Sequence, residues 1–445
     1  MAMRRLEVWL DFGLDAADAP APPRRVGTLA EDGPALAFEY APEFLAAPLL
    51  LSPYHLRAGP GLFRHDDRDF DGLPGALADA LPDGFGKLVQ DRAFEAQGLP
   101  RVRVTPMDRL AALGGAALGA LTFQPARPLA TELLREDWPL DLEALAAQGE
   151  RLLEGSPEEV LPQLIAAGGS PGGARPKILA GVHSDGRIIA GIIPAPVTGH
   201  AHPLTRGFRP WLIKFAARED VTAYGRDVGA VELAYWHMAG ASGIAMPPAR
   251  LFPTADGNRW FGVERFDRHG NGGHGRLHMH TLGGLLHATH RTPSLDYEAL
   301  LSATWELTRD IRAVAQAFLR VAFNVFAHNR DDHSRNFAFL MNSAGTWQLS
   351  PAYDLTFSAG FGGHHTTAIA GETMAPTAAG LVRLGEDAGL ARRDMQAALD
   401  QVAEAVGSWP KIARDLGVND AIIKRVELSL ADVRRSALPS APRIR

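Results

Sequence analysis

The sequence contains no cysteine among its 445 residues, which excludes disulfide bonds and thiolate metal sites. No apolar run is long enough to span a bilayer. The 45 basic residues are outnumbered by 51 acidic ones, and the net charge of −6 gives no bulk electrostatic reason to bind nucleic acid. The first ten residues become charged too soon for a signal peptide, so we expect a cytosolic protein that makes no contact with membranes.

The remaining composition is that of a globular protein, with 46% hydrophobic and 22% charged residues. A chain of this length is expected to hold two or three domains. Alternating apolar residues predict short strands over residues 4–52, whereas apolar residues recur at helical spacing from about residue 378 to residue 438. The pattern therefore predicts a β-rich beginning and a helical end.

The most informative stretch follows a helix predicted over residues 311–326, where apolar residues form a core-facing stripe. A polar cluster comes next, followed by two half-buried strands joined by a turn at residues 342–345. The helix and the hairpin should hold three polar side chains close together, namely Asp331, Asn336 and Asp354.

Asp331 and Asn336 have the spacing Asp-x-x-x-x-Asn of the phosphotransfer loop in protein kinases. There the aspartate accepts the hydroxyl proton and the asparagine holds magnesium. Asp354, beyond the hairpin, would complete a metal site, since hard oxygen ligands suit a cation that also bridges phosphate oxygens. A solvated loop with helix caps is the alternative for each residue alone, but their order and placement favour the kinase interpretation.

A glycine-rich segment runs from Gly168 to Lys177, between a predicted short helix and a predicted β-hairpin. Such a loop can lay backbone N–H groups over phosphates without obstruction by side chains. It does not fit the P-loop pattern, because no Lys-Ser/Thr pair opens a helix after it. Taken alone, such a segment is more often a plain flexible turn than a phosphate-binding loop.

A lysine stands among apolar residues in the predicted strand 211–214, where its burial would be costly without an anion. In kinases such a lysine reaches the nucleotide phosphates and a helix glutamate orients it. Glu232 lies in the helix predicted next, over about residues 225–240. A lysine that reaches solvent from an edge strand and an exposed glutamate are the alternatives. Residues 262–265 are the candidate hinge that would hydrogen-bond adenine through its backbone.

Residues 269–290 are rich in glycine and histidine, and the histidines could suggest zinc. Their spacings are irregular, however, and no cysteine or carboxylate partner is obvious. We therefore expect packing and surface roles for five of them, His274, His278, His280, His287 and His290.

In order along the chain, these motifs resemble the HipA family of serine/threonine kinases, the toxins of HipBA toxin–antitoxin modules. The resemblance covers about residues 5–435. It is carried in the second half by the glycine-rich loop ending at Lys177, Trp-Leu-Ile-Lys214, Glu-Arg-Phe-Asp-Arg268, Asn329-Arg-Asp-Asp-His-Ser-Arg-Asn336 and Pro-Ala-Tyr-Asp354. Three earlier segments resemble the small N-terminal domain of the family, namely Val26-Gly-Thr-Leu, Phe70-Asp-Gly-Leu-Pro and Leu81-Pro-Asp-Gly-Phe-Gly.

The resemblance implies an α+β, two-lobed protein-kinase-like fold with a small β-rich N-terminal subdomain and a mostly helical C-terminal lobe. We accordingly predict an N-terminal subdomain over residues 1–125 and a kinase N-lobe with the glycine-rich loop over residues 126–265. A helical C-lobe would follow over residues 266–438, and residues 439–445 would form a disordered tail.

The resemblance also implies roles for single residues in binding ATP and Mg²⁺. Asp331 would be the catalytic base, and Asn336 and Asp354 would hold Mg²⁺. Glu232 and Asp332 would be supporting residues; Asp332 adds a carboxylate where other members can have glycine, and it either adds charge near the metal or points away. The implied ATP-binding residues are Gly172, Gly173, Ala174, Arg175, Lys177, Lys214, Val263, Glu264, Arg265, His333 and Asn336.

Family members autophosphorylate a serine in the glycine-rich loop, which ejects the loop and blocks ATP binding. The matching residue is Ser170. A phosphate there would add nearly two negative charges and repel the phosphates of ATP. Pro171 and Pro176 make this loop stiffer than a plain glycine loop.

The resemblance implies a toxin kinase that phosphorylates a translation component such as an aminoacyl-tRNA synthetase and so arrests growth. A HipB-like helix-turn-helix antitoxin would bind the kinase and operator DNA, so that contact with DNA is indirect. Two alternatives stay open, a catalytically silent antitoxin partner or co-repressor and a small-molecule kinase. A protein acceptor needs a broad open face, whereas a small molecule needs an enclosed pocket near Asp331.

Overall fold

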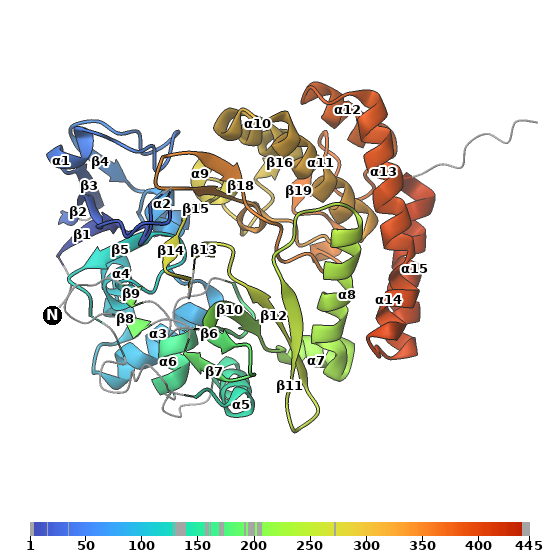
Figure 1. Ribbon diagram of the computed structural model, residues 1–445, viewed down its shortest axis with the longest axis horizontal. Helices are drawn as coiled ribbons and strands as arrows, with labels where there is room; N and C mark the ends of the chain where they lie inside the picture. Colours follow the sequence, from blue (N-terminus) through green and yellow to red (C-terminus); the bar gives the residue numbers. More distant parts are fainter. Residues whose placement is uncertain are drawn as a thin grey trace, which may run out of the picture.

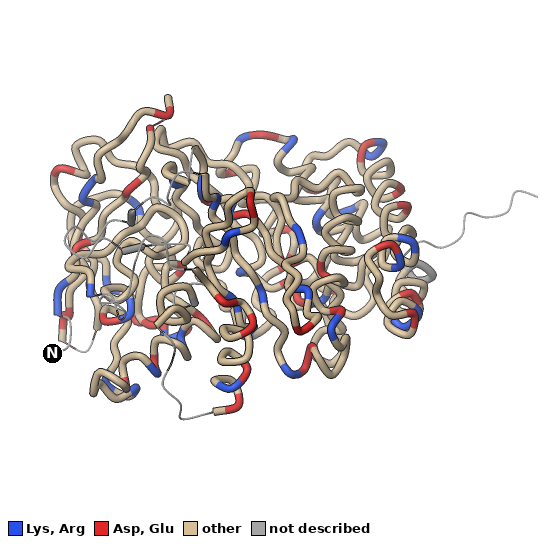
Figure 2. Tube along the Cα trace, turned by 60° about the horizontal axis from the view of Figure 1, so that its bottom comes forward, with Lys and Arg blue, Asp and Glu red and all other residues tan. Residues whose placement is uncertain are grey.

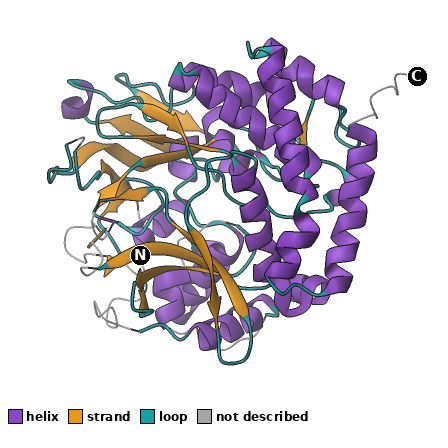
Figure 3. Cartoon of the chain, turned by 45° about the vertical axis from the view of Figure 1, so that its right-hand side comes forward, coloured by secondary structure: helices purple, strands orange, loops and turns teal. Residues whose placement is uncertain are grey.

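A computed structural model gives the structure of the chain. It describes residues 4–15, 17–33, 35–127, 129, 139–155, 160, 162–168, 173–190, 193–194, 201–202, 207–270 and 273–437. Strands gather on one side of the molecule and long helices on the other, as Figure 1 and Figure 3 show. The predicted α+β fold with a β-rich N-terminal region and a helical C-terminal part is confirmed.

The N-terminal region is built on an antiparallel sheet with the strand order β4-β3-β2-β1-β5. Its first strand shows why these residues form a sheet, because Leu6, Val8 and Leu10 alternate on the buried face, as their spacing predicts. Three helices accompany the sheet, and one of them, α4, begins with a capping box between Thr105 and Asp108. The bounds are β1 (Arg5–Leu10), β2 (Arg24–Asp32), β3 (Ala35–Tyr40), β4 (Leu62–His65), β5 (Leu121–Gln124), α1 (Pro42–Leu45), α2 (Gly75–Ala78) and α4 (Pro106–Leu113).

A second sheet has the strand order β11-β12-β10-β6-β7, with every neighbouring pair antiparallel. Helix α8 packs against it, as Figure 1 shows. The bounds are β6 (Lys177–His183), β7 (Ile188–Ala190), β10 (Phe208–Lys214), β11 (Ala249–Pro253), β12 (Arg259–Glu264), α7 (Arg218–Tyr224) and α8 (Val228–Ala241), beside the short pair β8 (Ile193–Pro194) and β9 (Ala201–His202).

Helix α3 (Gly84–Ala96) comes from the N-terminal region but packs into the core of the second sheet. Its Phe85 and Val89 are buried there with Leu142 of α5 (Leu142–Leu153) and Leu164 of α6 (Pro162–Gly168). Asp83 caps the start of α3 by accepting from the N–H of Gly84 at 2.8 Å. A division of the chain near residue 125 therefore separates side chains that share one apolar core.

The C-terminal part is helical and surrounds the buried helix α11, whose apolar side chains join the same continuous core as the N-terminal sheet. The bounds are α9 (Leu282–Leu286), α10 (Tyr297–Thr308), α11 (Ile311–Phe326), α12 (Ala378–Asp387), α13 (Arg392–Gly407), α14 (Trp409–Asp415) and α15 (Asp420–Ala437). Short 3₁₀ turns occupy Arg68–Phe70, Arg101–Arg103, Gly225–Asp227, Ser334–Asn336 and Phe361–Gly363.

The hairpin after α11 belongs to a three-stranded sheet with the order β15-β17-β18. The prediction of a half-buried strand is wrong for its middle strand, because all four residues of β17 are buried, with neighbouring strands on both sides. The bounds are β15 (His278–Thr281), β17 (Ala338–Met341) and β18 (Trp347–Leu349), and two smaller pairs are β13 (Arg268–His269) with β14 (Gly275–Arg276) and β16 (Leu295–Asp296) with β19 (Thr367–Ala368).

Charges of both signs are interspersed over the molecule in the view of Figure 2. No helix within the described ranges is long and apolar enough to cross a membrane.

The histidine-rich segment, residues 269–290, contacts the N-terminal region through three of its histidine side chains. His278 contacts the carbonyl oxygen of Leu51 at 3.0 Å, and His280 lies 2.6 Å from a carboxylate oxygen of Asp79. His287 accepts from the N–H of Gly75 at 3.1 Å. In the part of the chain that the structure describes, no three His, Asp or Glu side chains form a group that could hold a metal ion. Packing, the role expected from the irregular spacing, is what these three side chains do.

Acidification from pH 7 to pH 5 is expected to destabilise the folded chain through His278. Burial lowers the pKa of His278 to about 4, so the folded state resists a proton that the unfolded chain accepts near pH 6.5. The contribution of His278 to the free energy of unfolding is therefore fully present above pH 6.5 and is lost as the pH falls toward 4. At pH 5 the loss for this residue is about 2 kcal/mol. Urea unfolding at both pH values should show a smaller loss in His278→Gln than in the wild type, and equal losses would contradict this assignment.

Candidate active site

The candidate site lies where the end of β10, helix α8 and the segment after β18 meet. The ammonium group of Lys214, at the end of β10, forms ion pairs with the carboxylates of both Glu232 and Asp354. Glu232 comes from the buried face of α8, and Asp354 has a left-handed backbone, with φ of 53°. The lysine side chain is only 11% exposed, so the two carboxylates supply the partners that its burial requires.

The charges of this cluster hold one another ionised. Burial would raise the pKa of Asp354, but the charges of Lys214 and Lys177 outweigh burial and hold that pKa well below its usual value. Burial would likewise lower the pKa of Lys214, but Asp354 and Glu232 together keep it above its usual value. The site therefore holds a charged lysine and a charged aspartate in contact at neutral pH.

Lys177 adds a second buried cation beside the first. It lies opposite Lys214 in the pairing of β6 with β10. Burial lowers the pKa of Lys177, and the attraction of Asp354 is offset by the neighbouring charge of Lys214. No carboxylate within the described ranges lies at ion-pair distance from this ammonium group. A buried ammonium without its own carboxylate, next to another cation, is suited to an incoming anion such as a phosphate.

The described end of the glycine-rich loop lies directly over Lys177. Gly173 has φ of 96°, a backbone conformation that favours glycine, and a Cβ built on it would stand 2.6 Å from Nζ of Lys177. Arg175 pairs with Asp220 of α7 at 2.8 Å. Ala174 is exposed beside them. The other two loop residues that sequence analysis singled out, Gly172 and Ser170, lie outside the described residues.

The loop after α11 presents Asp331 and Asn336 together. The side-chain N–H of Asn336 donates to the backbone oxygen of Asp331 at 2.6 Å, within the 3₁₀ turn Ser334–Asn336. The side chain of Asp331 is 64% exposed, and its carboxylate lies 3.9 Å from Nε2 of His333. Burial lowers the pKa of His333, which favours its neutral form. The exposed carboxylate is thus open to an incoming hydroxyl group.

The two halves of the site share one electrostatic environment. Burial would lower the pKa of Arg175, but Asp220, Glu232, Asp354 and Asp331 together raise it above its usual value. Asp331 and Asp354 likewise both act to raise the pKa of His333, against its burial. The side-chain N–H of Asn329 lies 3.5 Å from the backbone oxygen of Asp354. The structure therefore brings together the lysine cluster and the Asp331–Asn336 loop that the sequence placed more than a hundred residues apart.

Asp332 points away from this cluster into the core. It is fully buried and its carboxylate accepts from the hydroxyl of Tyr297 at 2.6 Å and from the N–H of Thr366 at 2.7 Å, while Nδ1 of His365 lies 2.7 Å away. Of the two orientations left open by the sequence, the structure shows the second. These bonds hold residues 365 and 366 to the loop that carries Asp331 and Asn336.

Asp332→Ala is expected to destabilise the folded chain by roughly 3–5 kcal/mol, because the buried hydroxyl, ring and backbone groups around it would lose their acceptor. Urea unfolding of the variant measures the loss. Asp387→Ala, which removes an exposed carboxylate at the end of α12, is the matched control and should change the unfolding free energy by less than about 0.5 kcal/mol. Equal stability of the two variants would contradict the anchoring role of Asp332.

The candidate hinge is more constrained than its sequence suggests. The N–H of Glu264 donates to the oxygen of Pro248 at 2.8 Å, and the N–H of Arg265 donates to the oxygen of Pro210 at 2.9 Å. The side chain of Arg265 is buried in a two-point ion pair with Asp267. Adenine binding by Val263, Glu264 and Arg265 stays a prediction, and in this conformation it cannot use these two N–H groups.

Sequence analysis missed the buried network behind the loop. Asn329 donates to the side-chain oxygen of Asn324 at 2.9 Å, and Asn324 donates to the hydroxyl of Tyr297 at 3.0 Å. The hydroxyl of Tyr297 donates to Asp332, so the network links α10 and α11 to the loop that carries Asp331 and Asn336. The only sequence signal was a polar Asn324 within the apolar stripe of α11.

The residues present fit a divalent cation and a polyphosphate. Asp354 and Asn336 offer carboxylate and amide oxygens, the ligands that Mg²⁺ prefers. Magnesium is usually held by one or two carboxylates together with phosphates and water. Lys177 and Lys214 offer the positive charge that the phosphates require.

Comparisons with known proteins agree with this architecture. The family model of the HipA N-terminal domain matches residues 18–124, and the model of the HipA-like C-terminal domain matches residues 169–409. No curated protein matches the chain.

Solved structures that are similar to this chain include a toxin–antitoxin complex and a kinase. One is the complex of HipA, HipB and operator DNA of a toxin–antitoxin system from Shewanella oneidensis MR-1, with 19% identity, a TM-score of 0.67 and coverage of 97% of both chains. The other is the proinflammatory kinase CtkA from Helicobacter pylori, with 12% identity, a TM-score of 0.37 and coverage of 53% of this chain and 86% of that one. The first shares the fold over almost its full length. The model of the HipA-like C-terminal domain alone matches more than half of this chain, and the chain therefore belongs to the HipA family.

Proposed function

We propose that this chain is an ATP-dependent serine/threonine protein kinase and the toxin of a toxin–antitoxin module. The observation that carries the proposal is the contact of Lys214 with both Glu232 and Asp354, beside the loop of Asp331 and Asn336. In protein kinases the lysine–glutamate pair and the metal-binding aspartate must both be in place for phosphoryl transfer. Membership of the HipA family supports the toxin assignment.

In the proposed reaction, a serine or threonine hydroxyl attacks the γ-phosphorus of ATP in line with the bond to the departing ADP oxygen. Asp331 orients the hydroxyl and accepts its proton. Lys214, Lys177 and Arg175 face the charge that develops on the phosphate oxygens and on ADP. Asn336 and Asp354 would hold Mg²⁺, which when bound neutralises phosphate charge.

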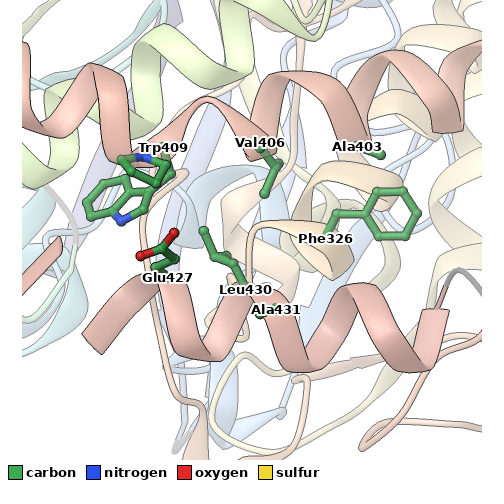
Figure 4. A pocket seen from close by; sticks show the side chains of 9 residues that line it. Phe326, Ala403, Val406, Trp409, Glu427, Leu430 and Ala431 are labelled. Carbon is green, nitrogen blue, oxygen red and sulfur yellow. The ribbon is translucent and has the colours of Figure 1, made fainter. Parts of the chain in front are cut away.

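A protein acceptor suits the site better than a small molecule does. Asp331 is 64% exposed, whereas a small acceptor would need an enclosed pocket around it. The apolar hollow in Figure 4 lies elsewhere, between α13, α14 and α15, with Phe326, Trp409 and Leu430 in its lining. From the resemblance to HipA kinases we propose a translation component such as an aminoacyl-tRNA synthetase as substrate, and Ser170 as the autophosphorylation site.

A HipB-like helix-turn-helix antitoxin is the proposed partner, because the similar solved complex contains HipA, HipB and operator DNA. Contact with DNA would be indirect. The net charge of −6 and the interspersed charges in Figure 2 support this part of the proposal, because direct binding to phosphates calls for a basic face.

The proposal is tested with the purified chain, Mg²⁺ and ATP labelled at the γ-phosphate, in the presence of cell extract. Proteins are separated on a gel and small molecules by thin-layer chromatography. Label in protein bands on serine or threonine is the expected result. Label only in small molecules would replace the proposal by a small-molecule kinase, and absence of label from both would favour a silent binding partner.

A further inference from the structure

We propose that residues 82–85 of the N-terminal region, here called the bracing segment, position the kinase site by holding the glycine-rich loop and the catalytic loop at a fixed separation. This inference rests on the proposed kinase function and adds to it a positioning residue, Asp83, that lies outside the kinase lobes. It follows from contacts that the bracing segment makes on two sides.

On one side, the bracing segment lies against the glycine-rich loop. The N–H of Phe85 donates to the backbone oxygen of Gly173 at 3.0 Å. A Cβ built on Gly84 would stand 2.6 Å from both that oxygen and Cα of Ala174, so the two backbones touch. The ring of Phe85 is buried in the core of the second sheet, and a Cβ built on Gly149 would stand 3.4 Å from both this ring and Cβ of Pro176. The end of the loop that leads into Lys177 is thus supported from the N-terminal region.

On the other side, Asp83 holds the catalytic loop. Its Oδ2 accepts from Arg335 at 2.8 Å and lies 3.1 Å from Nε2 of His290. Arg335 immediately precedes Asn336, and its backbone oxygen accepts from the hydroxyl of Tyr353 at 2.6 Å. Tyr353 in turn precedes Asp354. Oδ2 of Asp83 therefore contacts Arg335, the neighbour of Asn336. Through the backbone of Arg335 it is also linked to Tyr353, the neighbour of Asp354.

A second path leads from Asp83 toward the proposed base. The ring of His290 meets the ring of His333 edge to face, with 5.7 Å between centroids, and Nε2 of His333 lies 3.9 Å from the carboxylate of Asp331. The hydrogen bond from His290 and the charge of Arg335 hold the pKa of Asp83 well below its usual value. Asp83 is consequently charged at neutral pH and forms an ion pair with Arg335.

The two contacts are coupled through one side chain. Oδ1 of Asp83 accepts from the N–H of Gly84, which fixes the first turn of α3 and with it the N–H of Phe85. Oδ2 holds Arg335 from the same carboxylate. Because phosphoryl transfer depends on the placement of the phosphates relative to the catalytic aspartate, a shift of about 1 Å between these loops can cost on the order of a hundredfold in rate.

The inference is tested by steady-state kinetics and ATP binding of Asp83→Asn, with Asp141→Asn as the matched control. Both substitutions keep an oxygen that can cap a helix, but Asp141 caps α5 and touches neither loop. Asp83→Asn should raise KM and Kd for ATP about tenfold and lower kcat about tenfold. Asp141→Asn should keep the wild-type values at a comparable melting temperature.

A double-mutant cycle of Asp83→Ala and Arg335→Ala distinguishes positioning from general destabilisation. If Asp83 acts through Arg335, the loss in kcat/KM of the double variant should equal that of either single variant within about threefold. Multiplicative losses, or unchanged kinetics of Asp83→Asn in an active wild type, would overturn the inference and leave the kinase proposal intact. A wild type that neither binds ATP nor transfers phosphate would overturn the kinase proposal itself.

Discussion

Phosphoryl transfer is expected to fall at least about a thousandfold in Asp331→Ala, while the affinity for Mg·ATP stays within about threefold of the wild type. The reason is that Asp331 is exposed and is the proposed base, whereas the charges assigned to the phosphates belong to Lys177, Lys214 and Arg175. Single-turnover transfer of labelled phosphate and calorimetric titration with ATP measure the two quantities separately.

The control for this substitution is Asp387→Ala, since Asp387 is an exposed carboxylate on α12. It should leave both quantities unchanged. Retention of more than about a tenth of the wild-type transfer rate in Asp331→Ala would exclude Asp331 as the base. A parallel loss of ATP affinity would instead place Asp331 among the nucleotide-binding residues.

Lys214→Met is expected to abolish measurable ATP binding and to reduce transfer by about a hundredfold to a thousandfold. The substitution removes the cation that joins Glu232 to Asp354 and leaves two carboxylates facing the incoming phosphates. Isothermal titration with Mg·ATP gives the affinity, and circular dichroism on heating shows whether the variant is folded.

The matched control is Lys411→Met, because Lys411 forms a surface ion pair with Asp415 on α14 and is 80% exposed. This control should bind ATP like the wild type. A folded Lys214→Met variant with wild-type ATP affinity would contradict the placement of the phosphates beside the lysine cluster. Lys214→Arg gives a further comparison, since a planar guanidinium is larger than a compact ammonium and presents its donors in a fixed fork.

The sequence alone predicted the elements that follow from local patterns. The apolar stripe before the polar cluster predicted helix α11, and the apolar run that ends in a lysine predicted the end of β10. Each signal depends on residues within one or two turns or one strand, where periodicity and capping act. The predicted domain boundaries stay predictions, and the packing of α3 beside α5 and α6 shows why composition could not place them.

What the sequence could not supply were pairings between distant segments. Asp332 is adjacent to the proposed base, yet its partners come from α10 and from residues 365–367. The histidines of β15 contact Leu51, Ser52 and Asp79, more than two hundred residues earlier. Spacing carries no information about such contacts, so a carboxylate that anchors a loop and one that binds a metal look alike in the sequence.

The prediction of a half-buried strand was wrong for β17 for a related reason. Its apolar alternation indicated one exposed face, but all four of its side chains are buried and β15 and β18 flank it. The number of strands beside a given strand is a property of the assembled sheet rather than of the strand itself.

The measurement that tests the central claim most directly is intact-mass and peptide mass spectrometry of the phosphatase-treated chain after incubation with Mg·ATP, with Asp331→Ala treated in parallel. The account predicts a gain of one phosphoryl group on Ser170 in the wild type and no gain in the variant. An equal gain in both proteins, or no gain in a wild type that also fails to label any protein in extract, would contradict it.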